Sequence, residues 1–187
     1  EDLAEWGASS VRVGIGGGSI CSTRIQTGHG VPTFQSILDC STSAMTAEVP
    51  LIADGGIKNS GDIVKALAAG ADAVMVGSLI SGTEESPGEK ITRDGSVYKE
   101  YRGMASSRAQ LNWRGRVASK EGVAALVSYK GPVSEILQNL EAGIKSGLSY
   151  TGSESIAKFQ AQCDMIIQTS AGIVESNTHV FSRGLKI

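Results

Sequence analysis

Three short apolar segments, each followed by a loop of glycine, aspartate or serine, constrain the fold of this chain more than any other feature. They cover residues 11–15, 49–53 and 73–76, and two segments with helical periodicity, 32–44 and 63–69, lie between them. Strands that are apolar on both faces and alternate with helices are typical of a parallel α/β sheet. In a (β/α)8 barrel the carboxyl ends of such strands carry the active site. The three loops therefore predict a ligand site at one end of the sheet.

The loop after the first segment holds the strongest candidate for chemistry. Residues 14–18 include four glycines, and Cys21 follows three residues later. Glycines at this density let backbone N–H and carbonyl groups approach a ligand, and a cysteine beside such dipoles is a candidate nucleophile. The structural alternative is a plain turn with a buried cysteine. The loop matches neither the Gly-x-Gly-x-x-Gly fingerprint that opens a helix nor a P-loop.

Composition narrows the class of protein. The 187 residues carry a net charge of −2 and are 41% hydrophobic, which suits one globular core. This weak acidity gives no reason to expect nucleic acid or a membrane as a partner, and no apolar run approaches the length of a membrane span. Three widely spaced cysteines suit a reducing, cytoplasmic compartment and lack zinc-binding spacing. Cys40 and Cys163 are predicted core residues, and the isolated His29 and His179 receive no functional role.

The alternation of strands and helices stops after residue 82. Asp94-Gly95 between two short apolar-polar runs predicts a β-hairpin over residues 90–101. The polar segment 105–122 is predicted to be a mobile flap. The later predicted elements are an amphipathic helix over 132–146, a helix over 155–162 and a strand over 165–167.

Only three or four strands of a barrel can be counted, whereas a complete (β/α)8 barrel needs about 250 residues. The chain also opens inside a predicted helix over residues 1–8. We therefore expect the first barrel strands to lie outside this chain.

Eight segments, in order, resemble the inosine monophosphate dehydrogenase / GMP reductase family. They are residues 14–24 (GIGGGSICSTR), 52–57 (IADGGI), 60–62 (SGD), 74–78 (VMVGS), 82–88 (GTEESPG), 98–104 (YKEYRGM), 121–122 (EG) and 129–132 (YKGP). The resemblance implies an α/β fold that is the C-terminal half of a (β/α)8 TIM barrel with a β-hairpin and a flap insertion. It makes residues 1–187 one partial catalytic domain, with the flap at about 105–122.

The resemblance also implies a purine nucleoside monophosphate lying across the strand ends. Cys21 resembles the nucleophile that attacks C2 of the purine ring, Thr23 the catalytic threonine near that carbon, and Glu121 a catalytic and base-binding residue. Asp54 resembles the carboxylate that holds the ribose hydroxyls. The other implied substrate contacts are Ser19, Gly55, Gly56, Gly77, Ser78 and Tyr101, with Gly103 and Met104 at the base edge.

The implied cofactors and partners follow from the same resemblance. They are NAD, or NADPH for a reductase, and a potassium ion held by the backbone carbonyls of Gly16, Gly18 and Cys21. The partners are IMP, XMP or GMP, the N-terminal half of the barrel as a separate chain or segment, and further copies in a homotetramer.

Several of these residues have structural alternatives. Asp54 is also a common turn former, Ser78 a possible helix N-cap, Tyr101 a half-buried hairpin residue and Glu121 a solvated carboxylate.

The direction of the reaction stays open. Segments 52–57, 82–88 and 121–123 resemble the dehydrogenase, which oxidises IMP with NAD to XMP, and this assignment is favoured. Segment 105–122, however, lacks the Arg-Tyr pair that activates water in the dehydrogenases, and its length is closer to that of GMP reductase, which converts GMP and NADPH to IMP and ammonia. A nucleotide-binding module without catalysis and an inert fragment or structural subunit are the remaining alternatives.

Overall fold

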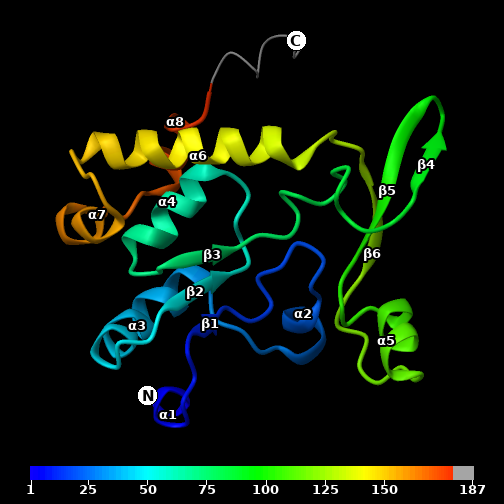
Figure 1. The fold of residues 1–187 in the computed structure, drawn as a ribbon, viewed down its shortest axis with the longest axis horizontal. Coiled ribbons are helices and arrows are strands. Elements are labelled where there is room, and N and C mark those ends of the chain that lie inside the picture. Colours follow the sequence, from blue (N-terminus) through cyan, green and yellow to red (C-terminus); the bar gives the residue numbers. More distant parts are fainter. Residues whose placement is uncertain (179–187) are drawn as a thin grey trace.

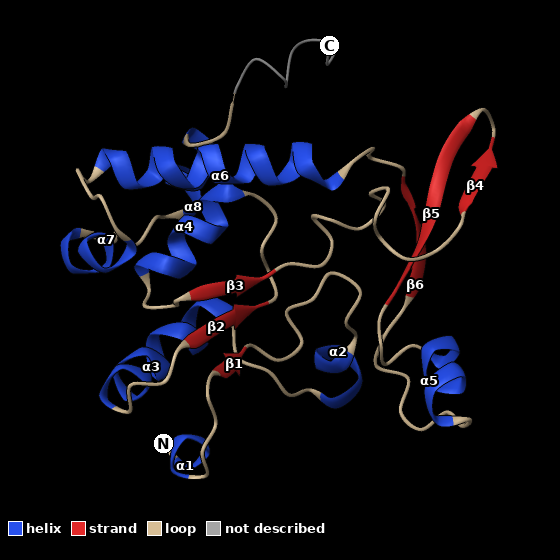
Figure 2. Cartoon of the chain, in the orientation of Figure 1, coloured by secondary structure: helices blue, strands red, loops and turns tan. Residues whose placement is uncertain are grey.

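The computed structural model describes residues 1–178 and contains two three-stranded sheets (Figure 1). The parallel sheet has the order β1 (Val11–Val13), β2 (Leu51–Asp54) and β3 (Ala73–Met75). The antiparallel sheet has the order β4 (Lys90–Arg93), β5 (Ser96–Arg102) and β6 (Ala124–Ser128). The predicted α/β fold, with parallel strands in the first half of the chain, is confirmed (Figure 2).

Eight helices connect and cover these strands within the described residues. They are α1 (Asp2–Glu5), α2 (Thr23–Thr27), α3 (Thr33–Thr46), α4 (Ser60–Ala68), α5 (Ser107–Arg114), α6 (Val133–Tyr150), α7 (Ile156–Gln162) and α8 (Ser170–Glu175). None of the helices within residues 1–178 is long and apolar enough to cross a membrane.

One face of the parallel sheet is packed against helices. Because side chains alternate along a strand, Leu51 and Ala53 point to the same face, where they are 1% and 0% exposed. Helices α3 and α4 cover this face, and α6 lies on the far side of α4 (Figure 1). Ile37 of α3 and Leu67 of α4 belong to the resulting core. Cys40 and Cys163 pack against it, as predicted.

The opposite face of the same sheet is not covered within the described part of the chain. Alternation places Arg12, Ile52, Ala73 and Met75 on it, and the Met75 side chain is 43% exposed. β1 and β3 form its two edges. Parallel sheets are as a rule covered on both faces, so this face has the character of an interior surface.

The hairpin prediction is confirmed, with β4 and β5 joined by Asp94 and Gly95 at φ angles of 51° and 77°. Two positive φ angles are the requirement of a type I′ hairpin turn. The sequence analysis missed β6, because its alanine-rich run gives little apolar alternation. It also missed α5 within the predicted flap, where Ser106 accepts the Ala109 N–H as N-cap and Gly115 ends the helix with a φ of 69°.

The predicted strand over residues 165–167 is wrong. This segment is irregular and exposed, with Ile167 fully accessible, and no strand among residues 1–178 pairs with it. The short helix α8, which the sequence analysis missed, follows. The first strand also ends two residues early, since Gly14 turns out of the extended conformation at a φ of 118°. His179 lies outside the described residues.

Core packing can be tested with a matched pair of isoleucines. Ile37→Ala should lower the free energy of unfolding by about 2–5 kcal/mol, because Ile37 is 1% exposed and its loss leaves a cavity. Ile167→Ala, at a fully exposed position, should change it by less than about 0.5 kcal/mol. Chemical denaturation of the full-length gene product measures both, and equal effects would contradict this description of the core.

Candidate active site

The loops that follow the three parallel strands all start at the carboxyl end of the sheet. Val13 pairs with Ala53, which pairs with Val74, so the chain leaves all three strands at nearly the same level. The carboxyl ends of parallel strands are where ligands bind in α/β proteins. The three loops predicted from the sequence therefore do lie at the same end of the sheet.

Glycines bring the first two loops into backbone contact. A Cβ atom added to Gly14 would lie 2.1 Å from the carbonyl oxygen of Asp54, and one on Gly55 would lie 2.8 Å from the carbonyl carbon of Gly17. The Gly56 N–H donates to the Gly17 carbonyl at 2.8 Å. Any side chain at these contacts would separate the loops, so the glycines hold the cysteine loop against the Asp54 turn.

Cys21 is half-buried on the first loop, next to a second segment from far along the chain. Its Sγ lies 3.2 Å from Thr23 Oγ1. The loop pairs with residues 120–123: the Ser22 N–H donates to the Glu121 carbonyl at 2.9 Å, and Cys21 forms an antiparallel bridge with Gly122. This pairing brings Cys21, Thr23 and Glu121 together.

The Glu121 carboxylate completes a short polar chain. The hydroxyls of Ser119 and, to a lesser degree, Thr23 hold the pKa of the Glu121 carboxyl below its ordinary value. A lowered pKa means that the ionised form is favoured. The Thr23 hydroxyl, which lies 3.2 Å from Cys21 Sγ, is thus also near the Glu121 carboxylate.

Asp54 makes an ion pair with Arg12, a residue that the sequence analysis did not single out. Both side chains project from the uncovered face of the sheet, and the Asp54 side chain is 25% exposed. The available signal was a single charge between two valines of β1. The pairing shows that Asp54 does more than form a turn.

The turn after β3 lies against the antiparallel sheet. A Cβ atom on Gly77 would sit 2.8 Å from the Tyr101 hydroxyl oxygen, so a side chain there would displace this hydroxyl. Ser78 follows and caps none of the eight helices described within residues 1–178. Gly77, Ser78 and Tyr101 are therefore brought together.

Segment 105–122 contains α5, and one buried side-chain amide connects the two ends of this segment. The Gln110 side chain donates to the carbonyls of Ala105 and Ser119, at 2.8 and 2.6 Å, and accepts the Ala118 N–H at 2.8 Å. This fixes the residues just before Glu121. Sequence reasoning missed Gln110 because a polar residue in a polar segment gives no signal.

A hollow of about 360 Å³ opens between α5 and Glu121. It is lined by Met104, Ala105, Gln110, Trp113, Arg114, Ala118, Ser119 and Glu121. Two of the predicted base-edge residues, Met104 and Glu121, thus line one cavity. Gly103 lies nearby, where its N–H donates to the Val123 carbonyl at 3.1 Å. A larger hollow of about 420 Å³ lies at the opposite end of the strands and contains none of the predicted site residues.

Ser19 is exposed on the cysteine loop, and no protein hydrogen bond holds its side chain within residues 1–178. The predicted potassium ligands are carbonyl oxygens of the same loop, which is the donor type that potassium takes in proteins. The Gly18 carbonyl accepts the Cys21 N–H at 3.0 Å and so belongs to the turn that presents the thiol. The chemical type of these donors suits a monovalent cation, and potassium stays a prediction.

Comparison with known proteins gives a consistent assignment. The model of the IMP dehydrogenase / GMP reductase domain matches residues 1–179. Inosine-5'-monophosphate dehydrogenase of Nitrosopumilus maritimus is 44% identical over 96% of this chain and 40% of its own length. GMP reductase of Leishmania major is 43% identical over 98% of this chain and 39% of its own length.

A solved structure shares the fold. A cysteine-to-alanine variant of GMP reductase from Trypanosoma brucei, in complex with guanosine 5'-monophosphate, has a TM-score of 0.90 and 43% identity over 95% of this chain and 38% of its own. The chain thus spans about two fifths of the length of the relatives it matches.

The position of the Glu121 carboxylate generates a titration prediction. Ser119→Ala should raise the pKa of Glu121 toward its ordinary value, because the Ser119 hydroxyl is the largest cause of the lowering. Ser107→Ala, on the same segment, should leave that pKa unchanged. Carboxyl-detected NMR titration measures both, and a Glu121 pKa that is unmoved in Ser119→Ala would refute the described contact.

Proposed function

Because this chain belongs to the IMP dehydrogenase / GMP reductase family, we propose that it binds a purine nucleoside 5'-monophosphate across the carboxyl ends of β1, β2 and β3. In this proposal Cys21 attacks C2 of the purine ring. The observation that carries it is the convergence of Cys21, Thr23 and Glu121, which come from segments about 100 residues apart in the sequence.

The proposal includes the completion of a (β/α)8 barrel by strands outside this chain, with residues 105–122 as its flap. Within residues 1–178, the sheet face with Arg12 and Met75 is uncovered and no further strand pairs with β1 or β3, which supports it. The length of the relatives supports it as well. A homotetramer and a cytoplasmic location stay predictions.

The nucleotide is oriented by groups from all three loops. The backbone N–H groups at Ser78 and the Tyr101 hydroxyl are the proposed phosphate contacts, together with Ser19 and Gly56. The Asp54 carboxylate accepts from the ribose hydroxyls, because it carries acceptors only. Gly103, Met104 and Glu121 lie toward the base edge.

The chemical step uses the polar chain from Cys21 to Glu121. Thr23 accepts the thiol proton and passes its own proton to the Glu121 carboxylate, so that a thiolate adds to C2. In the reductive direction the amino group of GMP then leaves as ammonia, which takes up the stored proton. A bound nicotinamide dinucleotide would supply the hydride to C2 in reduction or take it up in oxidation. In reduction the arriving hydride expels the thiolate of Cys21, which takes a proton from solvent. In oxidation water adds to C2, loses a proton and expels the thiolate, so that the product carries the oxygen of that water.

Different parts of the chain favour different directions of the reaction. The core motifs resemble the dehydrogenase, but they contact the purine monophosphate that both reactions share. The two reactions differ in one step, because only dehydrogenation requires an activated water molecule. Segment 105–122 corresponds to the part of the dehydrogenases that activates this water. Two of its three arginines make other contacts: Arg108 pairs with Glu100 at 2.9 Å, and Arg114 stacks on Trp113. This segment favours reduction of GMP as the second candidate function beside oxidation of IMP.

Assays of the full-length gene product decide between the two directions. Turnover of IMP with NAD supports the dehydrogenase, and turnover of GMP with NADPH supports the reductase. Monophosphate binding without turnover of either pair would leave a non-catalytic binding module, and absence of binding would overturn the proposal.

Removal of the proposed nucleophile tests the covalent step. Cys21→Ala should lower kcat by roughly a thousandfold or more, because no other group replaces the thiolate, while the Kd of the monophosphate changes little. Cys40→Ala, at a half-buried position of α3, should retain turnover. Loss of both turnover and binding in Cys21→Ala alone would argue against a covalent role.

A further inference from the structure

Four backbone N–H groups of the turn from Gly77 to Gly82, including the adjacent pair at Ser78 and Leu79, have no acceptor among residues 1–178. The N–H groups of Ile80 and Ser81 both donate back to the Gly77 carbonyl, at 3.2 and 3.0 Å. Those of Ser78 and Leu79 donate to no protein atom in the described chain. Free backbone N–H groups at such a turn are suited to an anion.

The Lys130 side chain holds the carbonyl side of this turn. Its Nζ donates to the carbonyl of Ser78 at 2.8 Å and to that of Leu79 at 3.0 Å. Desolvation of the ammonium group lowers the pKa of Lys130 below its ordinary value. In a planar trans peptide the carbonyl and the N–H point in opposite directions. By fixing the Ser78 carbonyl, Lys130 therefore fixes the direction of the Leu79 N–H.

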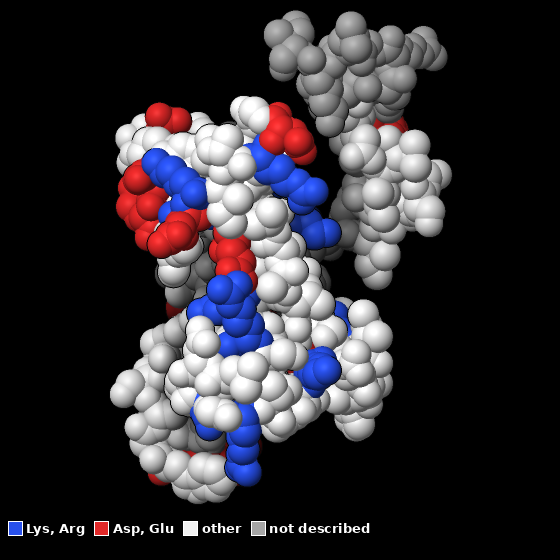
Figure 3. Space-filling view, turned by 90° about the vertical axis from the view of Figure 1, so that its right-hand side faces the viewer, with Lys and Arg blue, Asp and Glu red and all other residues white. Residues whose placement is uncertain are grey.

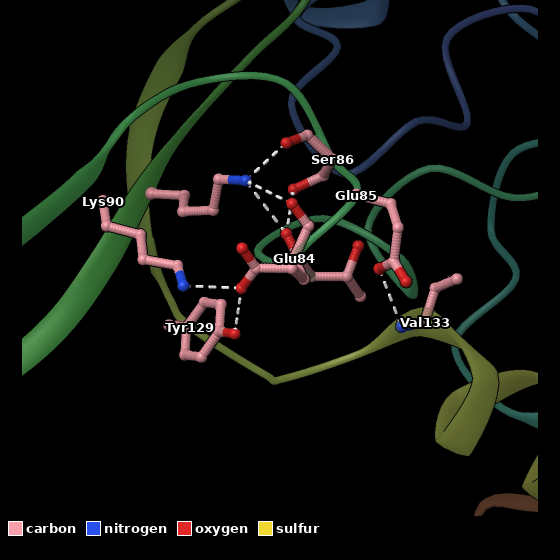
Figure 4. Close-up of polar contacts among 8 residues, drawn as sticks. Glu84, Glu85, Ser86, Lys90, Tyr129 and Val133 are labelled. Carbon is pink, nitrogen blue, oxygen red and sulfur yellow. Dashed lines mark hydrogen bonds and ion pairs between the residues drawn. The ribbon is translucent and has the colours of Figure 1, made fainter.

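The backbone that carries Lys130 is itself attached to the loop after the turn. The Lys130 N–H donates to the Gly82 carbonyl at 2.9 Å, and the Glu84 N–H donates to the Gly131 carbonyl at 2.8 Å. Side chains strengthen this attachment (Figure 4): Glu84 contacts Tyr129 and Lys90, and Glu85 accepts the Val133 N–H at 2.8 Å. These contacts fix the position of the Lys130 backbone relative to the turn.

A second lysine secures the same loop from β5. Lys99 is 3% exposed, and its Nζ donates to the carbonyls of Thr83 and Glu84 at 3.0 and 3.1 Å, and to that of Ser86. Unlike Lys130, it contacts neither the Ser78 carbonyl nor the Leu79 carbonyl. On the face seen in Figure 3, basic and acidic side chains lie side by side in the upper part, and basic side chains predominate in the lower part.

We propose that Lys130 is a positioning residue for the phosphate of the nucleotide, acting through the Ser78–Leu79 peptide. This rests on the proposed function and goes beyond it, because it assigns a role to the Tyr-Lys-Gly-Pro motif at residues 129–132. Lys130 does not touch the phosphate; it keeps the Leu79 N–H directed at it and adds a positive charge behind the turn.

The test compares a purine monophosphate with its nucleoside, which lacks the phosphate. In the full-length gene product, Lys130→Met should weaken monophosphate binding about tenfold and leave nucleoside binding unchanged. KM should rise similarly, with kcat within about threefold of the wild type. Lys130→Arg, which keeps a cationic donor, should restore most of the discrimination. Lys145→Met, on the exposed side of α6, is the matched control and should have no effect.

The outcomes separate this inference from the proposed function. If the wild type binds no purine monophosphate, the proposed function fails and this inference fails with it. If the wild type binds the monophosphate but Lys130→Met binds it equally well, or loses nucleoside and monophosphate affinity to the same extent, only the inference fails. Should Lys130→Met not fold, Lys130→Gln is the second probe and should show the same selective loss in smaller measure.

Discussion

The backbone contact between Gly17 and Gly55 is the constraint on which the site depends. The Gly56 N–H donates to the Gly17 carbonyl across this contact, and a Cβ atom on Gly55 would lie 2.8 Å from the backbone of Gly17. Because the two loops touch, the turn that presents Cys21 is held beside Asp54 rather than extended into solvent. Side chains on both glycines would separate the proposed nucleophile from the proposed ribose contact.

The antiparallel sheet supplies the other side of the site. Tyr101 of β5 reaches Gly77, residues 120–123 just before β6 pair with the Cys21 loop, and Lys130 just after β6 holds the turn after β3. One sheet therefore provides the thiol and the free backbone groups, and the other fixes their orientation. The geometry of the site therefore depends on the polar contacts that fix one sheet relative to the other.

Local patterns were sufficient to predict most of the fold. The parallel strands, the main helices and the Asp-Gly hairpin follow from apolar periodicity and turn chemistry, which act between near neighbours in the sequence. β6 and the irregular segment 165–167 did not follow, because a strand depends on a partner that the sequence does not show. Likewise Cys21 was visible from its glycine loop, whereas Arg12, Gln110 and Lys130 matter only through tertiary contacts.

The central claim is that the thiol of Cys21 forms a covalent bond to the purine ring. Peptide mass spectrometry of the full-length gene product, quenched by acid during turnover with monophosphate and nicotinamide cofactor, tests it most directly. The account predicts, on the peptide that contains Cys21, a mass increase equal to the purine nucleotide less what is lost when the C2–S intermediate forms: two hydrogens from IMP and the thiol, or ammonia from GMP and the thiol. Turnover with no such increase, or an increase on the peptides of Cys40 or Cys163 instead, would contradict it.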